Sequence, residues 1–340
     1  MATILGIEST CDETGAAVVV DGVDVRSNIV ASQVELHEKY HGVVPEIASR
    51  AHIENILPTI REALAVAKVT PDDIDAVAVA HRPGLIGSLL IGVTSAKTLA
   101  WALDKRLIGV DHVHAHLYSV MLDNARTHPD FPAVGLVCSG GHTALYRMND
   151  WLDVALIGST IDDAVGEAYD KVSAILGLGY PGGPIIDNLA REGRHDAVRF
   201  PRSTLGRDSL DFSFSGLKTA VLYHVRGVPG RDETPPAPDA AQRRDIAASF
   251  QAACVDILIA KINRAARQIG ARSVIVGGGV SANSGLREAL GRMELTCHVP
   301  HVRYCTDNAA MTAGLADVLM RNGRFATLDL DAVTFSRFAD

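Results

Sequence analysis

The sequence lacks several features that would each indicate a particular class of protein. None of its five cysteines lies in a C-x-x-C pair, and their odd number argues against a disulfide framework and a thiolate zinc site. No uninterrupted apolar run reaches the roughly 18 residues of a membrane-crossing helix. The first residues reach Glu8 at once instead of forming a signal peptide. We therefore expect a protein of the reducing cytoplasm with no membrane partner.

A phosphate-binding signature and an excess of basic residues are also missing. The pattern G-x-x-x-x-G-K-[ST] does not occur, which disfavours a P-loop. The net charge of −8 does not indicate nucleic-acid binding, because contact with phosphates requires local positive charge. Aromatic residues make up only 5%, so the core must consist mainly of aliphatic side chains.

A strand-turn-strand pattern occurs twice in the chain. Two pairs of apolar runs are each separated by a polar turn, at residues 4–8 with 15–20 and at 133–138 with 143–148. Later, a strand pattern runs into the three glycines 277–279. This duplication favours an α/β fold of the actin, sugar-kinase and heat-shock-chaperone (ASKHA) type, with duplicated sheet-and-helix lobes and a central cleft.

The same patterns predict the domains and several helices. We assign residues 1–109 plus 312–340 to an N-terminal lobe, and residues 110–311 to a C-terminal lobe that carries the metal and nucleotide sites. One helix is predicted over 161–177, with Asp163, Glu167 and Asp170 on one face. The last helix is expected to be capped by Thr306 or Asp307.

Two histidines at helical spacing form a candidate metal site. His112 and His116 lie four residues apart in a helical pattern, so both imidazoles fall on one helix face, whereas His114 points elsewhere. An isolated pair of this kind most often consists of ordinary surface or core histidines, and a metal needs a third ligand, for which Asp307 is a candidate. Two imidazoles and one carboxylate leave open positions for a substrate. The H-E-x-x-H glutamate is missing, which argues against a metalloprotease.

Glycine-rich turns and acidic residues are the other candidates. The turn Ser139-Gly140-Gly141-His142 offers backbone N–H groups to phosphate or carboxylate oxygens. Asp12 and Glu13 lie in the first polar turn, where they could handle water, a metal or a proton, and Asp170 could bind a hydroxyl group. Tight turns and a solvated acidic face are the simpler interpretations of these residues.

Nine motifs in order give the chain a resemblance to one family. It resembles the tRNA N6-adenosine threonylcarbamoyltransferase family, the TsaD group of bacterial type, almost from end to end. The motifs are GIESTCDETGAAVV (6–19), HEKYHGVVPEIASRAHIENI (37–56), PGLIGSLLIGVTSAKTLA (83–100), HVHAH (112–116), SGGHT (139–143), DDAVGEAYDKVSAILGLGYPGGP (162–184), FSFSGLKTAV (212–221), GGGVSAN (277–283) and CTDNAAM (305–311).

The resemblance implies a reaction and its partners. The threonylcarbamoyl group of L-threonylcarbamoyl-adenylate would be transferred to N6 of the adenosine 3′ to the anticodon (position 37) in tRNAs that read ANN codons, with release of AMP. A paralogous partner subunit and a small ATPase would complete the bacterial complex. The remaining alternatives are an ASKHA-type small-molecule kinase or carbamoyltransferase and a non-catalytic scaffold.

The resemblance also implies the roles of individual residues. His112, His116 and Asp307 would hold one divalent ion per subunit, Fe²⁺ or Zn²⁺, and the catalytic turn would contain Asp12 and Glu13. The substrate-binding positions would be Val137, Cys138, Ser139, Gly140, Gly141, Asp170, Gly183, Asp187 and Asn283. The chain departs from the family pattern at Arg82, where glycine is usual, and at His114.

Overall fold

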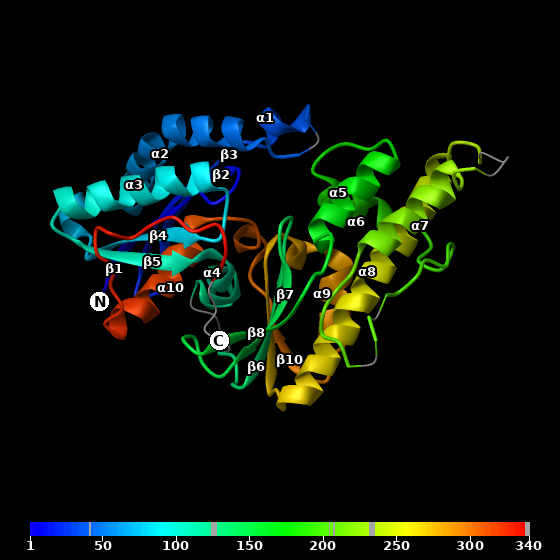
Figure 1. The fold of residues 1–340 in the computed structure, drawn as a ribbon. Coiled ribbons are helices and arrows are strands. Elements are labelled where there is room, and N and C mark those ends of the chain that lie inside the picture. Colours follow the sequence, from blue (N-terminus) through cyan, green and yellow to red (C-terminus); the bar gives the residue numbers. More distant parts are fainter. Residues whose placement is uncertain (41, 124–127, 204, 207, 231–234, 337–340) are drawn as a thin grey trace. The chain divides into compact units, whose positions relative to one another are not determined.

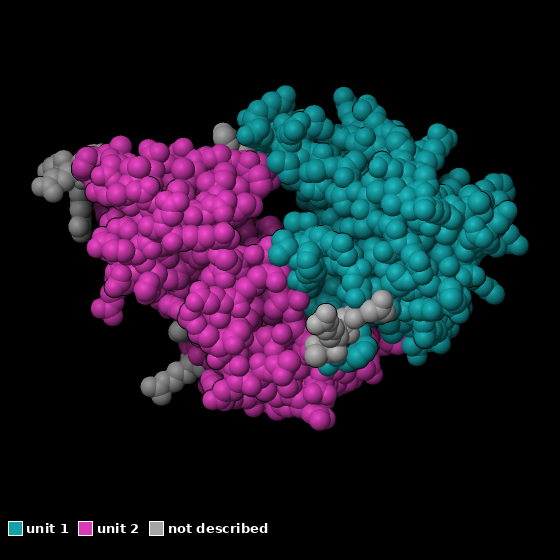
Figure 2. All heavy atoms as spheres, turned by 180° about the vertical axis from the view of Figure 1, so that it is seen from behind, with its two compact units in different colours: residues 1–128, 300–340 teal, residues 129–299 magenta. Residues whose placement is uncertain are grey.

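The computed structural model describes residues 1–336 except 41, 124–127, 204, 207 and 231–234. The chain divides into two compact units, coloured in Figure 2: unit 1 comprises Met1–His128 and Pro300–Asp340, and unit 2 comprises Pro129–Val299. Among the helices of the described residues, none has the length and apolar character that crossing a membrane requires.

Unit 1 is built on a five-stranded mixed sheet with the order β3-β2-β1-β4-β5 (Figure 1). The first hairpin is confirmed, since β1 and β2 are antiparallel and Glu8 lies opposite Gly15. β3 continues the antiparallel part, whereas β4 is parallel to β1 and β5 is parallel to β4. The strands are β1 (Thr3–Glu8), β2 (Glu13–Val20), β3 (Asp24–Ser32), β4 (Ala76–Arg82) and β5 (Arg106–Asp111).

Unit 2 repeats this plan with the order β8-β7-β6-β9-β10. β6, β7 and β8 are antiparallel, and β9 and β10 add parallel strands on the other side of β6. The predicted duplication of the strand-turn-strand pattern is therefore confirmed. The strands are β6 (Ala133–Cys138), β7 (Thr143–Met148), β8 (Val154–Ser159), β9 (Ser273–Gly277) and β10 (Thr296–His298).

Helices cover both faces of the unit 1 sheet. Leu5 and Ile7 of β1 share one core cluster with Ile56 of α2 and Leu89 of α3. The alternate residue Gly6 faces α10, where a Cβ atom would come within 2.5 Å of the Ala309 carbonyl oxygen, so the absent side chain lets this helix lie close to the sheet. The helices are α1 (Val34–Glu38), α2 (Pro45–Ala67), η1 (Pro71–Asp73), α3 (Ile86–Ala102), α4 (His112–Tyr118), η2 (Ser119–Met121), η4 (Val302–Tyr304) and α10 (Ala309–Arg321).

The core of unit 2 is organised around the long helix α8. Phe250, Cys254 and Leu258 recur at helical spacing and pack in one cluster with Val134 and Leu136 of β6. The helices of this unit are α5 (Val165–Ile175), α6 (Gly182–Ala190), α7 (Ser215–Arg226), α8 (Ala240–Ile269), η3 (Gly279–Ala282) and α9 (Ser284–Gly291).

The boundaries of the two units differ from the predicted ones. Residues 110–128 and 300–311, which the sequence patterns assign to the C-terminal lobe, belong to unit 1. The physical reason is that α4 continues directly from β5 and packs against α10, which in turn packs on β1 and β2. All three predicted metal ligands therefore lie in unit 1 and not in the lobe where we had placed them.

The predicted helix over 161–177 begins later than expected. α5 starts at Val165, so Asp163 lies outside the helix and does not share a helix face with Glu167 and Asp170. Its carboxylate instead accepts hydrogen bonds from Lys171 and Lys218, each at 2.7 Å. The two lysines tie the residues before α5 to both α5 and α7.

Candidate active site

The helix that carries the two histidines is short and well capped. β5 ends at Asp111, whose side chain accepts hydrogen bonds from the backbone N–H groups of Val113 and His114 and so starts α4. The one-turn spacing then places His112 and His116 on the same face, with ring centroids 4.6 Å apart. Both side chains are buried. The predicted pairing of these imidazoles is confirmed.

Asp307 joins the imidazole pair from the segment before α10. Its Oδ1 atom lies 3.0 Å from Nε2 of His116 and 3.5 Å from Nε2 of His112. The ligand atoms of these three residues all lie within 4.8 Å of one another, and His114 is not part of the group. Two imidazole nitrogens and one carboxylate oxygen fit a transition metal such as zinc or iron that keeps open positions.

The cap of α10 differs from the prediction. Asn308, and neither Thr306 nor Asp307, caps this helix by accepting a hydrogen bond from the backbone N–H group of Met311. The Asp307 carboxylate is therefore directed at the imidazoles. A run of Thr, Asp and Asn offers three good capping residues in a row, so local propensity alone does not select one of them.

Glu8 is a buried carboxylate behind the imidazole pair. Its Oε2 atom lies 3.1 Å from Nδ1 of His112 and 3.2 Å from the Thr312 hydroxyl, and its Oε1 atom accepts a hydrogen bond from the Thr10 N–H group. When a metal is bound, a proton on Nδ1 that is shared with Glu8 would leave the Nε2 lone pair of His112 available to that metal.

The charges around the imidazoles affect the two rings differently. Burial on its own lowers the pKa of His112, but the carboxylates of Glu8 and Asp307 outweigh it and raise that pKa to about 9. Burial lowers the pKa of His116. Without a metal, the two imidazoles thus carry one positive charge between the carboxylates of Glu8 and Asp307. A bound cation would replace this positive charge.

The turn that carries Asp12 and Glu13 is held by its backbone carbonyls. The Cys11 carbonyl accepts hydrogen bonds from Nε2 of His52 at 3.0 Å and from the Ser88 hydroxyl at 3.2 Å. The Asp12 carbonyl accepts one from the Gln33 N–H group at 3.1 Å. Sequence reasoning missed all three donors, because each comes from an element remote in sequence.

Asp12 and Glu13 lie in a setting that favours protonation. Burial, and second to it the charge of Asp307, raises the pKa of Asp12. Burial raises the pKa of Glu13 to about 7, although a hydrogen bond from Ser32 opposes this shift. Oε2 of Glu13 is buried and has no hydrogen-bond partner within the described part of the chain. Neither residue belongs to the group of His112, His116 and Asp307, whose ligand atoms lie within 4.8 Å of one another.

The predicted substrate-binding turn of unit 2 lies between β6 and β7. Val137 and Cys138 end β6, and the Ser139 N–H group donates to the His142 carbonyl at 2.8 Å. This N–H group is therefore used within the turn, which corrects the expectation that it is available for a ligand. The turn is open at Gly140 and Gly141, since a Cβ atom built on either would meet nothing within 4 Å.

Two further glycines support this turn from behind. A Cβ atom on Gly166 would lie 2.5 Å from the Ser139 carbonyl oxygen, and one on Gly278 would lie 2.4 Å from that of Cys138. Gly278 also has a φ of +90°, which side-chain-bearing residues rarely adopt. The turn is thus packed closely on one side and open on the other.

The remaining predicted substrate-binding residues gather in the same unit. Asp170 accepts a hydrogen bond from the Gly182 N–H group at 2.7 Å, next to Gly183, whose Cβ position is open. Asp187 on α6 accepts hydrogen bonds from the N–H group and the hydroxyl of Ser284, and Asn283 caps α9. β6 and β9 are parallel, and both the glycine turn and Asn283 follow their carboxyl ends, where ligands bind in α/β sheets.

Comparison with known proteins identifies the family. A family model described as "TsaD: tRNA N6-adenosine threonylcarbamoyltransferase" matches residues 24–314. The chain belongs to this family. A protein of that name from Symbiobacterium thermophilum is 53% identical to this chain, and one from Moorella thermoacetica is 50% identical. Each alignment covers 97% of this chain and 95% of the relative. The chain is accordingly a transferase of tRNA modification.

Solved structures with low sequence identity share the fold. HypF from T. kodakarensis has a TM-score of 0.60 and 17% identity over 97% of this chain and 49% of that chain. The activator of the 2-hydroxyisocaproyl-CoA dehydratase from Clostridium difficile has a TM-score of 0.53 and 14% identity over 95% and 97%. These likenesses support the ASKHA-type fold predicted from the duplicated sheets.

Arg82, which departs from the pattern expected of a threonylcarbamoyltransferase, has a defined role here. Its Nε atom lies 3.2 Å from Oδ2 of Asp111, the residue that caps α4. The guanidinium group therefore contacts the carboxylate that starts the histidine helix.

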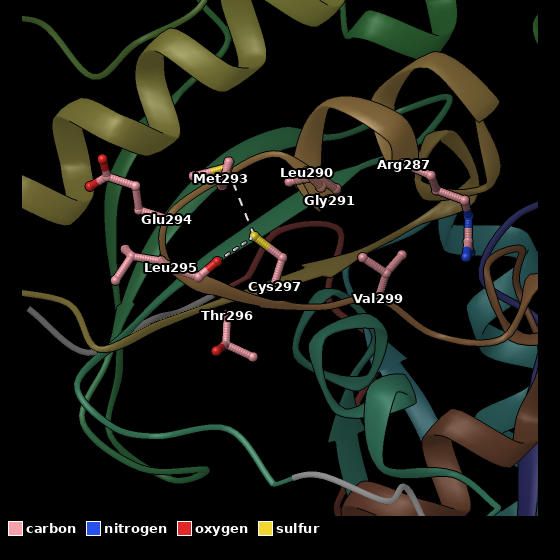
Figure 3. A pocket seen from close by; sticks show the side chains of 9 residues that line it. All are labelled: Arg287, Leu290, Gly291, Met293, Glu294, Leu295, Thr296, Cys297 and Val299. Atoms are coloured by element: carbon pink, nitrogen blue, oxygen red, sulfur yellow. Dashed lines mark hydrogen bonds between the residues drawn. The ribbon is translucent and has the colours of Figure 1, made fainter.

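A cavity of about 360 Å³ in unit 2 is separate from the predicted site residues of this transferase (Figure 3). Cys297 lies in its lining, with Sγ 3.4 Å from the Leu295 carbonyl oxygen and 3.8 Å from the Met293 sulfur. Burial raises the pKa of Cys297 to about 11, so at neutral pH this side chain is a thiol and a weak nucleophile. Thiolate chemistry in this cavity is therefore disfavoured.

Proposed function

We propose that this chain transfers the threonylcarbamoyl group of L-threonylcarbamoyl-adenylate to N6 of the adenosine 3′ to the anticodon in tRNAs reading ANN codons. The adenosine N6 attacks the carbamoyl carbon, the bond from that carbon to the phosphate oxygen breaks, and AMP leaves. The observation that carries the proposal is the convergence of His112, His116 and Asp307 in a chain of this family.

His112, His116 and Asp307 would hold one Fe²⁺ or Zn²⁺ ion per subunit. When bound, such an ion supplies a Lewis acid that favours the negative charge developing on the donor. Glu8 orients His112 from behind, and the burial of both histidines excludes competing water from their rings. The open coordination positions of a three-ligand site leave room for the donor.

The proposal assigns binding of the donor to unit 2. A Cβ atom on Gly140 or Gly141 would meet nothing within 4 Å, so the turn is accessible at both glycines, and their backbone N–H groups are proposed to bind anionic oxygens. Asp170, Asp187 and Asn283 supply polar groups for the nucleotide portion. Val137, Cys138 and Ser139 position the turn through β6 and its hydrogen bond to His142.

Asp12 and Glu13 are proposed to move the proton of the attacking amine. The N6 amine is a weak, delocalised nucleophile, so it needs placement and a base. Burial gives Glu13 a pKa of about 7, close to the value that general-base catalysis at neutral pH favours. The hydrogen bonds of His52 and Ser88 to the Cys11 carbonyl fix the turn from which both carboxylates project.

We propose that the chain works in the cytoplasm with tRNA, a paralogous partner subunit and a small ATPase. A net charge of −8 favours a composite tRNA-binding surface to which partners contribute. Helices α2 and α3, which pack against each other (Figure 1), expose the apolar side chains of Ile53, Leu57, Ile86 and Leu90, which suit contact with a second subunit.

A reconstituted transfer reaction tests this function. The full chain with its partners, the adenylate donor labelled in its threonine and an unmodified ANN-reading tRNA should yield labelled tRNA. His112→Ala should lower the rate by at least about 100-fold, the order expected when a main electrostatic stabiliser is removed. His114→Ala removes the neighbouring histidine outside the ligand group and should keep the rate. Labelled tRNA formed equally by both variants would contradict the proposal.

A further inference from the structure

A single glutamine links two of the residues proposed to bind the nucleotide. Gln251 lies on α8 and is 7% exposed. Its Nε2 atom donates to Oδ1 of Asp187 at 3.0 Å, and its Oε1 atom accepts from Nδ2 of Asn283 at 2.7 Å. The Tyr169 hydroxyl lies 3.5 Å from the same Oε1 atom.

These partners determine which end of the amide faces which residue. A carboxylate accepts hydrogen bonds, so the Gln251 NH₂ group must face Asp187. The Asn283 side chain uses its own Oδ1 atom to cap α9 through the Leu286 N–H group, so its NH₂ group must face the Gln251 oxygen. A carboxylate at position 251 would repel Asp187, and an apolar side chain would leave both partners without this bond.

The network fixes the two partners from several sides. Asp187 also accepts hydrogen bonds from Ser284 and Arg191, and Asn283 is held at its oxygen by the start of α9. Gln251 thus joins Asp187 within α6 to Asn283 at the start of α9. Gln251 donates to Asp187 and accepts from Asn283, so it acts through these two residues.

We infer that Gln251 is a positioning residue for the adenylate portion of the donor. It holds the Asp187 carboxylate and the Asn283 amide at the carboxyl end of β9, where the nucleotide is proposed to bind. This inference rests on the proposed function for the identity of the ligand. Such pre-organisation affects how tightly the nucleotide binds and leaves the transfer step itself, once the donor is bound, largely unchanged.

Calorimetric titration of the full chain with AMP, the nucleotide product, tests the inference. Gln251→Met keeps the volume of the side chain but removes its amide, and should weaken AMP binding about tenfold, as expected for the loss of two buried hydrogen bonds. Gln268→Met is the matched control, because Gln268 is an exposed glutamine on the same helix. Gln251→Asn, which keeps the amide but shortens its reach, should also weaken binding and serves if the first variant does not fold.

Kinetics separate a positioning role from a merely structural one. In the reconstituted reaction, Gln251→Met should raise KM for the adenylate donor about tenfold and leave kcat within about twofold. Metal content should not change, because the metal ligands belong to unit 1. AMP affinity within twofold of the wild type in a folded variant overturns the inference, as does a wild-type chain that does not bind AMP. A wild type that binds AMP but modifies no tRNA contradicts the proposed function alone.

Discussion

Replacing Glu8 by glutamine tests how the buried carboxylate behind His112 contributes to metal binding. The substitution keeps the size of the side chain but removes its charge and one of its two acceptor oxygens. In the wild type, Oε1 accepts from the Thr10 N–H group, and Oε2 lies near both His112 Nδ1 and the Thr312 hydroxyl. A glutamine NH₂ group must therefore face at least one donor.

The magnitude follows from the position of Glu8 relative to the ligand. A carboxylate that orients a ligating imidazole typically contributes about 10- to 100-fold in metal affinity. The side chain of Glu8 is fully buried, so solvent does not replace the lost charge or acceptor. We therefore expect Glu8→Gln to weaken Zn²⁺ binding by about 10- to 100-fold, which corresponds to about 1.4–2.7 kcal/mol.

A competition titration against a chromophoric chelator measures this affinity directly on the full chain. Asp317→Asn is a suitable control, because Asp317 is also a buried carboxylate of unit 1 but pairs with Arg321 on α10 and contacts no metal ligand. Thermal unfolding of the metal-free proteins checks that both variants fold. Zinc affinity of Glu8→Gln within twofold of the wild type would refute the assigned orienting role.

Substitutions at three other positions test the site and its support. The pKa of Glu13 rises from 4.5 to about 7 on folding, so the wild type loses stability as the pH rises through this window. Glu13→Gln should therefore have a higher melting temperature than the wild type at pH 8 but not at pH 4. The same difference in melting temperature at both pH values would contradict this expectation. Asn308→Ala removes the cap of α10 and should lower the free energy of unfolding in urea by about 1–2 kcal/mol; an unchanged value would argue against the cap. His52→Leu removes the donor to the Cys11 carbonyl, whereas His52→Gln retains an N–H group. His52→Leu should therefore slow tRNA modification more than His52→Gln. Equal rates for the two variants would exclude a role of this hydrogen bond in holding the turn.

The parts of the molecule that follow from local patterns could be predicted from the sequence. The two predicted hairpins are found as β1 with β2 and β6 with β7, and each lies in one of the two five-stranded sheets. The spacing of His112 and His116 sufficed to place their rings together, because a helix turn fixes the neighbours at four residues.

Contacts between residues that are far apart in the chain could not be predicted from the sequence. Glu8 meets His112 across 104 residues, and Gln251 meets Asp187 across 64, so no periodicity relates them. The boundary of the units was misplaced for the same reason, because the packing of α4 on α10 is a long-range contact. The one local sign was the position of Glu8 at the end of the apolar run ILGIE, because a carboxylate that is buried with such a strand needs a partner.

The metal content of the purified full chain tests the account most directly. Elemental analysis should find about one iron or zinc ion per wild-type chain, and almost none in a variant that combines His112→Ala with His116→Ala. The His114→Ala variant should retain the ion. A wild-type chain that modifies tRNA at its full rate without bound metal, or a double variant that binds as much metal as the wild type, would contradict the assignment of these residues.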